Sequence, residues 1–208
     1  MLQTQTVEPD TFSLLKDLMK VPELKGFDLV GGTALSLIFG HRQSIDLDLF
    51  STANFDSEAL LKSLKKKFSD QFFIEDKPIR FGIFCAIRNV KVDLVRYPHT
   101  PIRAKYEIDT IRFASTEDII AMKVQAVLGR ARKKDFWDIA TLLEHYSVED
   151  FARFHKEKFS TQNLLVSVPQ AISYFADAED DVDPVSLKGQ TWESVKEAIQ
   201  EKVRGFLS

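Results

Sequence analysis

Two aspartates, Asp46 and Asp48, alternate with apolar residues in segment 44–50. In an extended strand alternate side chains point to the same face, so this spacing predicts two adjacent carboxylates. Adjacent carboxylates repel each other, and a hard divalent cation such as Mg²⁺ or Mn²⁺ relieves that repulsion by taking their oxygens as ligands. An Asp-x-Asp pair also occurs in solvated turns, so the pair alone leaves both interpretations open.

Two consecutive glycines, Gly31 and Gly32, stand between two segments of opposite character. Residues 27–30 have strand character, whereas 33–39 is an apolar segment with helical character that is followed by Gly40, a residue typical of helix ends. A glycine pair lets the backbone turn tightly and approach a phosphate, which the free N–H groups of the following helix would bind. The sequence thus predicts a phosphate-binding loop that leads to a metal-binding strand.

The order of strand, Gly-Gly, helix and Asp-x-Asp strand resembles the signature of the DNA polymerase β-like nucleotidyltransferase superfamily. The closer similarity is to the AbiEii/AbiGii-type nucleotidyltransferase toxins, whose first motif corresponds to residues 31–35 and 41–50. Segments 117–123 and 132–139 match later motifs of that family, and the resemblance covers about residues 27–145.

Superfamily members add a third carboxylate from a neighbouring strand, and Asp93 is the candidate for it. Segments 79–87 and 90–97 are apolar and alternating, and Arg88-Asn89 between them is typical of a hairpin turn. Apolar residues bracket Asp93, which places it on the opposite face from them. The alternative is an exposed aspartate on an edge strand.

The resemblance implies metal-dependent transfer of a nucleotidyl group from a nucleoside triphosphate (NTP), with release of pyrophosphate. Asp46 and Asp48 would hold the metal ions, and Asp93 would bind the metal beside the attacking oxygen or accept its proton. Gly31 and Gly32 would bind the triphosphate through their backbone N–H groups.

Several polar residues near the first motif are further candidates. Either Thr33 or Ser36 would add a hydroxyl contact to the nucleotide. The resemblance places Arg42 and Ser44 in the nucleotide site, with Ser44 near the phosphates or the metal. The alternative is local structure: Ser44 bonds the backbone of its own loop, and Arg42 pairs with a surface acid. We expect His41 to be structural.

A helix is expected to begin at Ser115 or Thr116, and Lys123 lies within its apolar pattern. A lysine on an amphipathic helix is ordinarily a solvated or snorkelling side chain. The family motif instead contributes an active-site lysine that neutralises triphosphate charge. Asp118 would orient this lysine or cap the helix, and Asp135, in the last motif, would fix Lys123 or a basic neighbour.

Two charged segments follow. Four basic residues lie between two expected helices: Arg130, Arg132, Lys133 and Lys134. They form either a solvated face or a guide for an RNA acceptor or the NTP. Segment 177–183 holds five acids and is expected to be a solvated loop before a helix capped by Thr191, with a second metal site as the alternative.

We therefore expect an α/β (α+β) nucleotidyltransferase fold. Residues 1–114 would form a mixed sheet of about four or five strands flanked by helices. Residues 115–208 would form a helical region that completes the active-site cleft. This region would include a helix that starts at Ser147 and another over 161–175, interrupted near Pro169.

Composition agrees with an intracellular enzyme. The 208 residues suffice for a sizeable core, and the single cysteine, Cys85, excludes an intramolecular disulfide. No apolar segment approaches the roughly twenty residues that span a membrane, and no secretion signal opens the chain, so we expect a cytoplasmic location. The net charge of −3 argues against general coating of nucleic acid.

Two classes of function remain from the sequence. The first is an active nucleotidyltransferase, for which the resemblance implies an RNA acceptor such as tRNA and a toxin role in a toxin–antitoxin or phage-defence system with a cognate antitoxin. A small-molecule acceptor such as an antibiotic is a variant of it. The second is a non-catalytic module that binds a nucleotide or a partner. The presence of the glycine pair and all three acids favours the enzyme.

Overall fold

The computed structural model describes residues 1–74 and 81–207, so the first two residues of the predicted strand 79–87 lie outside the described part. The chain forms two compact units. Unit 1 contains residues 1–38, 44–100 and 104–114, and unit 2 contains residues 39–43, 101–103 and 115–208. Two short segments, 39–43 and 101–103, therefore belong by their contacts to the unit that the C-terminal region forms.

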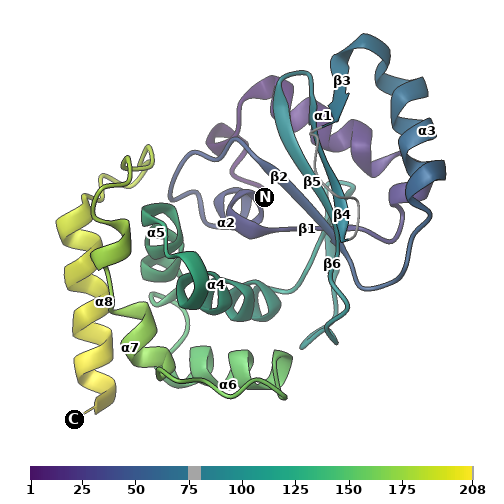
Figure 1. Ribbon diagram of the computed structural model, residues 1–208. Coiled ribbons are helices and arrows are strands. Elements are labelled where there is room, and N and C mark those ends of the chain that lie inside the picture. Colours follow the sequence, from purple (N-terminus) through teal and green to yellow (C-terminus); the bar gives the residue numbers. More distant parts are fainter. Residues whose placement is uncertain (75–80, 208) are drawn as a thin grey trace. The chain divides into compact units, whose positions relative to one another are not determined.

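Unit 1 is built on a mixed sheet of seven strands within the described residues, in the order β3-β4-β5-β2-β1-β7-β6 (Figure 1). The strands are β1 Asp28–Val30, β2 Leu47–Ser51, β3 Phe72–Ile74, β4 Gly82–Ile87, β5 Val90–Arg96, β6 Tyr106–Ile108 and β7 Ile111–Phe113. β2 lies parallel to β5 and β1 lies parallel to β7, whereas the other neighbours are antiparallel. The expectation of four or five strands is wrong because β3, β6 and β7 have only three residues each, which is too short for a hydrophobic period to identify a strand.

The helices of unit 1 cover part of this sheet. They are η1 Thr4–Thr6, α1 Pro9–Met19, η2 Pro22–Leu24, α2 Gly31–Phe39, α3 Ser57–Phe68 and η3 Ser69–Gln71, where η denotes a 3₁₀ turn. α1 packs against β7, and α3 packs against β3 and β4. α2 ends before Gly40, whose φ of +68° gives the left-handed conformation that closes a helix, as predicted.

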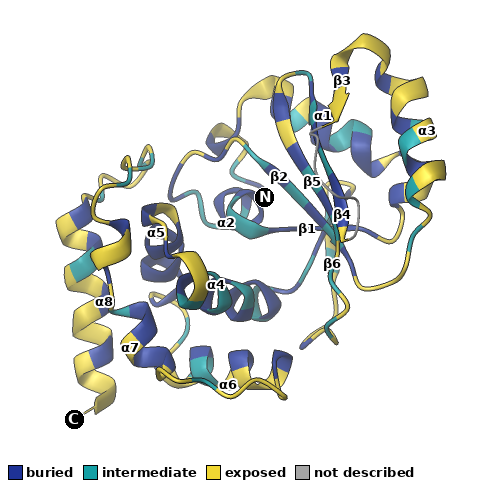
Figure 2. Ribbon diagram, viewed as in Figure 1, coloured by how far each residue is buried: buried dark blue, intermediate teal, exposed yellow. Residues whose placement is uncertain are grey.

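The two faces of β2 and β5 differ sharply in burial (Figure 2). Leu47 and Val92 on one face are fully buried, whereas Asp48 and Asp93 on the other face are only partly buried. We call this second face the polar face. The strand expected within segment 44–50 begins at Leu47. The chain before it is irregular, and Ile45 is therefore 66% exposed.

The predicted hairpin is confirmed. Arg88 and Asn89 have φ values of +52° and +62° and connect β4 to β5. β5 is paired with β4 on one side and with β2 on the other, so Asp93 is not on an edge strand and that alternative is wrong. Cys85 is buried in β4.

Unit 2 consists of helices. They are α4 Thr116–Arg130, α5 Lys133–Leu142, α6 Val148–Lys158, α7 Val168–Ile172, η4 Ala176–Ala178 and α8 Trp192–Leu207. Ser115 and Ser147 cap α4 and α6 as predicted. The predicted helix 161–175 is wrong: only Val168–Ile172 is helical, and Pro169 lies in its first turn, where the missing N–H is not needed.

Aromatic side chains form the core of unit 2. Trp137 stacks on Trp192 with ring centroids 5.8 Å apart, and Phe136 contacts the rings of Phe175 and Trp192. Phe136 and Trp137 are therefore core residues. In the described part of the chain, no helix has the length and apolar character needed to cross a membrane.

Candidate functional site

The predicted acids meet on the polar face through the register of two parallel strands. Asp48 on β2 is the direct partner of Asp93 on β5, and Leu47 is the partner of Val92. The register begins at Leu47, and Asp46 lies one residue before it. Because residues two apart in a strand share a face, Lys91 and Asp93 lie together on the polar face, beside Asp48.

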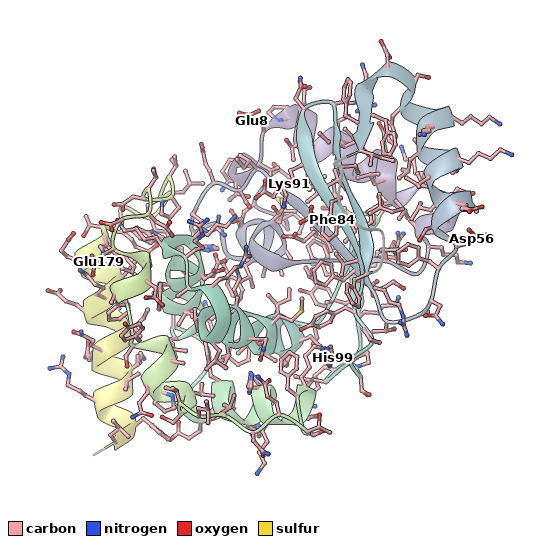
Figure 3. The ribbon with its side chains drawn as sticks, in the orientation of Figure 1. Glu8, Asp56, Phe84, Lys91, His99 and Glu179 are labelled. Carbon is pink, nitrogen blue, oxygen red and sulfur yellow. The ribbon has the colours of Figure 1, made fainter. Side chains whose placement is uncertain are left out.

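Lys91, which is labelled in Figure 3, lies against the carboxylate of Asp93. Its Nζ donates a hydrogen bond to Oδ2 of Asp93 over 2.7 Å. Burial alone would lower the pKa of Lys91, but the hydrogen bond to Asp93 and the negative charges of Asp93, Asp46 and Asp48 raise it. All three carboxylates therefore act on the same ammonium group.

The polar face has some features of a divalent-metal site and lacks others. Within residues 1–74 and 81–207, no three His, Cys, Asp or Glu side chains come together in an arrangement ready to hold a metal, and Lys91 lies against Asp93. Two features nevertheless fit a cation: Oδ1 of Asp93 is buried without a hydrogen-bond partner, and the donor set consists of carboxylate oxygens, which Mg²⁺ prefers. The paired carboxylates of Asp48 and Asp93 would suit a divalent metal, and Lys91 would have to leave Asp93 to admit it.

Gly31 is required by the carboxylate of Asp48. Gly31 has a φ of +70°, and a Cβ at this position would lie 2.5 Å from Oδ2 of Asp48. From the sequence, the glycine pair is expected to allow the approach of a phosphate. The structure gives a second reason for Gly31: a Cβ there would occupy the space of the Asp48 carboxylate. Gly31 and Gly32 form the start of α2, where backbone N–H groups lack partners within the helix and can bind an anion.

Gly31→Ala is expected to destabilise the protein by about 1–3 kcal/mol and to displace the carboxylate of Asp48, because alanine combines left-handed strain with a steric clash. Urea unfolding measures the loss. Gly129→Ala is the matched control: a Cβ there has no heavy atom within 4 Å, and the position is helical, so stability should rise by about 0.5–1 kcal/mol. Equal effects of the two changes would contradict this assignment.

Thr33 and Ser44 hold the chain that leads into β2. Their hydroxyl oxygens are 2.8 Å apart, and Oγ1 of Thr33 also donates to the carbonyl of Asp46. The backbone N–H of Ser44 donates to the carbonyl of Thr6 over 2.9 Å. The hydroxyl of Ser44 thus contacts the side chain of Thr33 and not the backbone of its own loop. Ser36 is fully buried, so its hydroxyl does not face a bound nucleotide.

Unit 2 contains a second charged cluster, centred on Asp138. Its Oδ1 accepts hydrogen bonds from Nε2 of His41 over 2.7 Å and Nε of Arg42 over 2.8 Å. Its Oδ2 lies 2.6 Å from Nζ of Lys123, which also donates to Oδ1 of Asp135 over 2.8 Å. All five side chains are buried. We call them the Asp138 cluster.

The charges of the Asp138 cluster stabilise one another. Burial raises the pKa of Asp138, but the charges of Arg42 and Lys123 together hold it well below its usual range. Burial lowers the pKa of Lys123, and the charges of Asp135 and Asp138 more than offset this and raise it. Lys123 is therefore a buried cation, and the interpretation as a solvated or snorkelling lysine is wrong.

The contacts of Arg42 and Asp135 refine two further predictions. Arg42 pairs with the buried Asp138, not with a surface acid, and Asp135 contacts Lys123 as expected. Sequence reasoning assigned no role to Asp138. The available signal was its position three residues after Asp135, which puts both carboxylates on one side of α5.

Asp118 has a different place from the one predicted. Its carboxylate accepts hydrogen bonds from the backbone N–H of Ile102, the hydroxyl of Ser115 and Nζ of Lys158. Lys123 contacts Asp135 and Asp138, so the prediction that Asp118 orients Lys123 is wrong. Asp118 instead anchors the start of α4, which is nearer to the predicted capping role.

The acidic segment 177–183 is largely exposed, as expected of a solvated loop, but two of its acids bind the start of α5. Oδ1 of Asp181 lies 2.5 Å from Arg132, its Oδ2 accepts a hydrogen bond from the backbone N–H of Lys133, and Asp183 pairs with Nζ of Lys133 at 2.8 Å. The segment is thus bound to the start of α5. Burial would raise the pKa of Asp181, but the bonds and charges of Arg132 and Lys133 lower it. The alternative of a second metal site gains no support.

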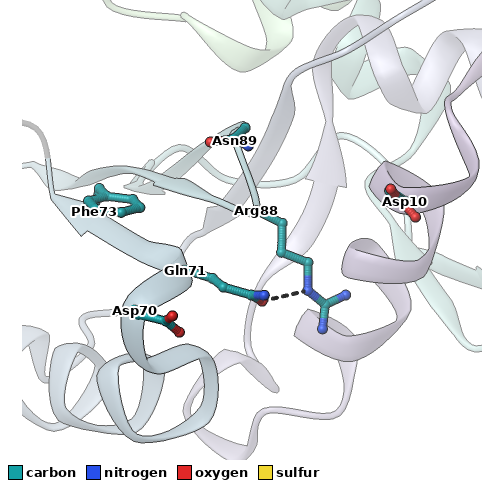
Figure 4. A pocket seen from close by; sticks show the side chains of 6 residues that line it. All are labelled: Asp10, Asp70, Gln71, Phe73, Arg88 and Asn89. Atoms are coloured by element: carbon teal, nitrogen blue, oxygen red, sulfur yellow. Dashed lines mark hydrogen bonds between the residues drawn. The ribbon is translucent and has the colours of Figure 1, made fainter.

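A cavity of about 550 Å³ lies elsewhere in unit 1 (Figure 4). It is lined by Asp10, Asp70, Gln71, Phe73, Arg88 and Asn89. Arg88 donates to Oε1 of Gln71 over 3.3 Å and to Oδ2 of Asp17 over 2.9 Å. None of the lining residues belongs to the predicted site, so we assign the cavity no part in the chemistry.

Comparison with known proteins identifies the family. The family model described as "Nucleotidyl transferase AbiEii toxin, Type IV TA system" matches residues 13–204. The chain belongs to the AbiEii nucleotidyltransferase toxin family. This AbiEii member is therefore a nucleotidyltransferase, as predicted, and the alternative of a non-catalytic module is wrong. The family also implies an NTP substrate, a toxin role and an antitoxin partner.

Individual proteins resemble this chain over most of its length. The AbiEii member is 29% identical over 189 residues to the uncharacterized protein aq_aa25 of Aquifex aeolicus strain VF5, covering 87% of this chain and 88% of that protein. The crystal structure of JHP933 from Helicobacter pylori matches with a TM-score of 0.58 and 21% identity, covering 98% of this chain and 92% of that one. MenT4, a nucleotidyltransferase toxin from Mycobacterium tuberculosis H37Rv, matches with a TM-score of 0.58 and 12% identity, covering 94% and 84%. The predicted fold class is confirmed.

Proposed function

We propose that this protein transfers a nucleotidyl group from an NTP to an RNA acceptor such as tRNA, in a reaction that depends on a divalent metal ion. Its setting would be the cytoplasm, with a cognate antitoxin limiting its effect. The observation that carries the proposal is the direct pairing of Asp48 with Asp93 across two parallel strands, beside the N-terminus of α2.

Asp46, Asp48 and Asp93 would hold the metal, Mg²⁺ or Mn²⁺. A metal bound there would activate the acceptor oxygen and stabilise the charge that develops on the transferred phosphate. Asp93 is suited to accept the proton of the acceptor hydroxyl, because its Oδ1 has no other hydrogen-bond partner. The backbone N–H groups of Gly31 and Gly32 would bind the triphosphate.

Three residues of the Asp138 cluster would serve the nucleotide through their charge. Lys123 supplies a buried cation. Its Nζ donates a hydrogen bond to Oδ1 of Asp135 over 2.8 Å, which holds the ammonium group in place. Arg42 is held by two hydrogen bonds to the carboxylate of Asp138. Fixed positive charges of this kind stabilise transferring phosphoryl groups without reorganisation.

The basic residues that precede and open α5 support an RNA acceptor. Arg130, Arg132 and Lys134 are exposed, and Arg132 keeps 56% of its side chain accessible while it pairs with Asp181. Exposed cations of this kind attract the phosphates of a nucleic acid in a sequence-independent way. The chain as a whole carries a net charge of −3, so these exposed cations stand against an acidic background.

The test is transfer of label from NTP to RNA. The purified protein is incubated with each α-labelled NTP in turn, with total RNA and Mg²⁺ or Mn²⁺. We expect label in RNA with a preferred NTP, loss of labelling after chelation by EDTA, and recovery when metal is restored. Label only in protein or small molecules would overturn the RNA acceptor, and labelling that persists in EDTA would overturn the metal requirement.

A further inference from the structure

We propose that Lys91 is a built-in counter-ion of the carboxylate site: its ammonium group stabilises Asp46, Asp48 and Asp93 when no metal is bound, and it must leave Asp93 before a divalent metal is held. This inference rests on the metal-dependent function proposed above. It gives a role to a residue that the sequence analysis did not assign.

The geometry places Lys91 within the set of acids. It lies two residues before Asp93 on the same face of β5, and Asp93 is the direct strand partner of Asp48. Its Nζ is 2.7 Å from Oδ2 of Asp93, at an oxygen that a metal ion would also need. Lys91 and a metal ion at Asp93 are therefore alternatives.

The charges explain why the lysine is there. Three carboxylates on one patch repel one another, and repulsion between partly buried charges is only weakly reduced by solvent. The ammonium of Lys91 is bonded to Asp93, whose direct strand partner is Asp48, so its positive charge lies beside these carboxylates. Lys91 thus lowers the cost of keeping the acids together before a metal arrives.

The exposed fractions of the two side chains indicate that Lys91, and not Asp93, moves when a metal binds. The side chain of Lys91 is 44% exposed, whereas that of Asp93 is only 15% exposed. A long, half-exposed lysine can swing into solvent or toward a bound triphosphate, while the carboxylate stays in place. The exchange needs no change in the strands.

The first experiment measures Mn²⁺ binding in the absence of nucleotide. Electron paramagnetic resonance reports the concentration of free Mn²⁺ at each point of the titration. We expect Lys91→Met to bind Mn²⁺ roughly 3- to 10-fold more tightly than the wild type, because no ion pair has to be broken. Lys105→Met is the matched control, since Lys105 pairs with Asp28 at 3.1 Å in the same unit and is similarly exposed, at 55%. It should leave the affinity unchanged, and equal or weaker binding by Lys91→Met overturns the proposal.

The second experiment uses the wild type and so does not depend on the folding of a variant. Amine-reactive labelling, read by mass spectrometry, should modify Lys91 several-fold faster at saturating Mg²⁺, when its ammonium has left Asp93. Labelling of Lys105 should not change. A labelling rate of Lys91 that is the same with and without Mg²⁺ overturns the proposal.

The outcomes separate this inference from the function on which it rests. If the wild type binds no Mn²⁺ and transfers no label, both fail. If the wild type binds Mn²⁺ and transfers label while Lys91→Met has unchanged affinity, only the role of Lys91 fails.

Discussion

Asp48→Asn is expected to reduce label transfer by at least about 10³-fold, because loss of one metal-binding charge removes several kcal/mol of transition-state stabilisation. Asparagine keeps the shape of the side chain, so the space beside Gly31 stays filled. The initial rate of transfer at saturating Mg²⁺ measures the effect, and circular dichroism with urea unfolding checks the fold.

Asp70→Asn is the control for a change of charge in the same unit. Asp70 is exposed and lies in η3, outside the polar face, so its replacement should alter the rate by less than about twofold. A folded Asp48→Asn protein that transfers label at a rate close to the wild type would remove Asp48 from the chemistry, and with it the metal site proposed here.

The parts of the fold that follow local rules were predictable from the sequence. The strand before Gly31, the helix that ends before Gly40 and the hairpin at Arg88-Asn89 depend on hydrophobic period and turn chemistry over a few residues. The same holds for the cap at Ser115. These features carry the first motif and place Asp93 on a strand.

The pairing between distant segments could not be predicted in the same way. β6 and β7 have three residues each, and their connection uses Asp109 and Thr110 with positive φ instead of the glycine that usually marks such a turn. The attachment of the acidic segment depends on ion pairs between residues about fifty positions apart, such as Arg132 with Asp181. Charge alone predicts a solvated loop there.

The candidate site likewise has features that the local sequence predicts and features that depend on contacts between distant segments. The alternating pattern predicts Asp48 on the polar face, but its alignment with Asp93 depends on the register of two strands that are far apart in the chain. Asp138 was missed because its partners His41 and Arg42 are 97 and 96 residues away. A helix pattern shows that Asp138 is near Asp135 but not which cations they meet.

In each unit a lysine lies against neighbouring carboxylates, but the side chains of the two lysines differ in solvent exposure. Lys91 has a 44% exposed side chain, which allows exchange for another cation. Lys123 has a 9% exposed side chain and lies between two carboxylates, which fixes it. We therefore expect a metal to replace the first lysine, whereas the second keeps its place throughout the reaction.

Lys123→Met is expected to lower the free energy of unfolding by about 3–5 kcal/mol, because it leaves the buried carboxylate of Asp135 without a partner. Asp138 keeps its bonds to His41 and Arg42, so the loss centres on Asp135. The rate of label transfer should fall by at least about 10²-fold, in line with removal of a fixed positive charge. Urea unfolding and initial rates measure the two effects.

The double variant Lys123→Met/Asp135→Asn separates a structural from a catalytic lysine. Removing both charges of a buried pair is often close to neutral, so most of the lost stability should return. If Lys123 acts on the triphosphate, transfer stays low in the stabilised double variant, because the cation is still missing. Recovery of transfer along with stability would show that Lys123 only supports the fold, and the charge on the triphosphate would then have to be met by other residues.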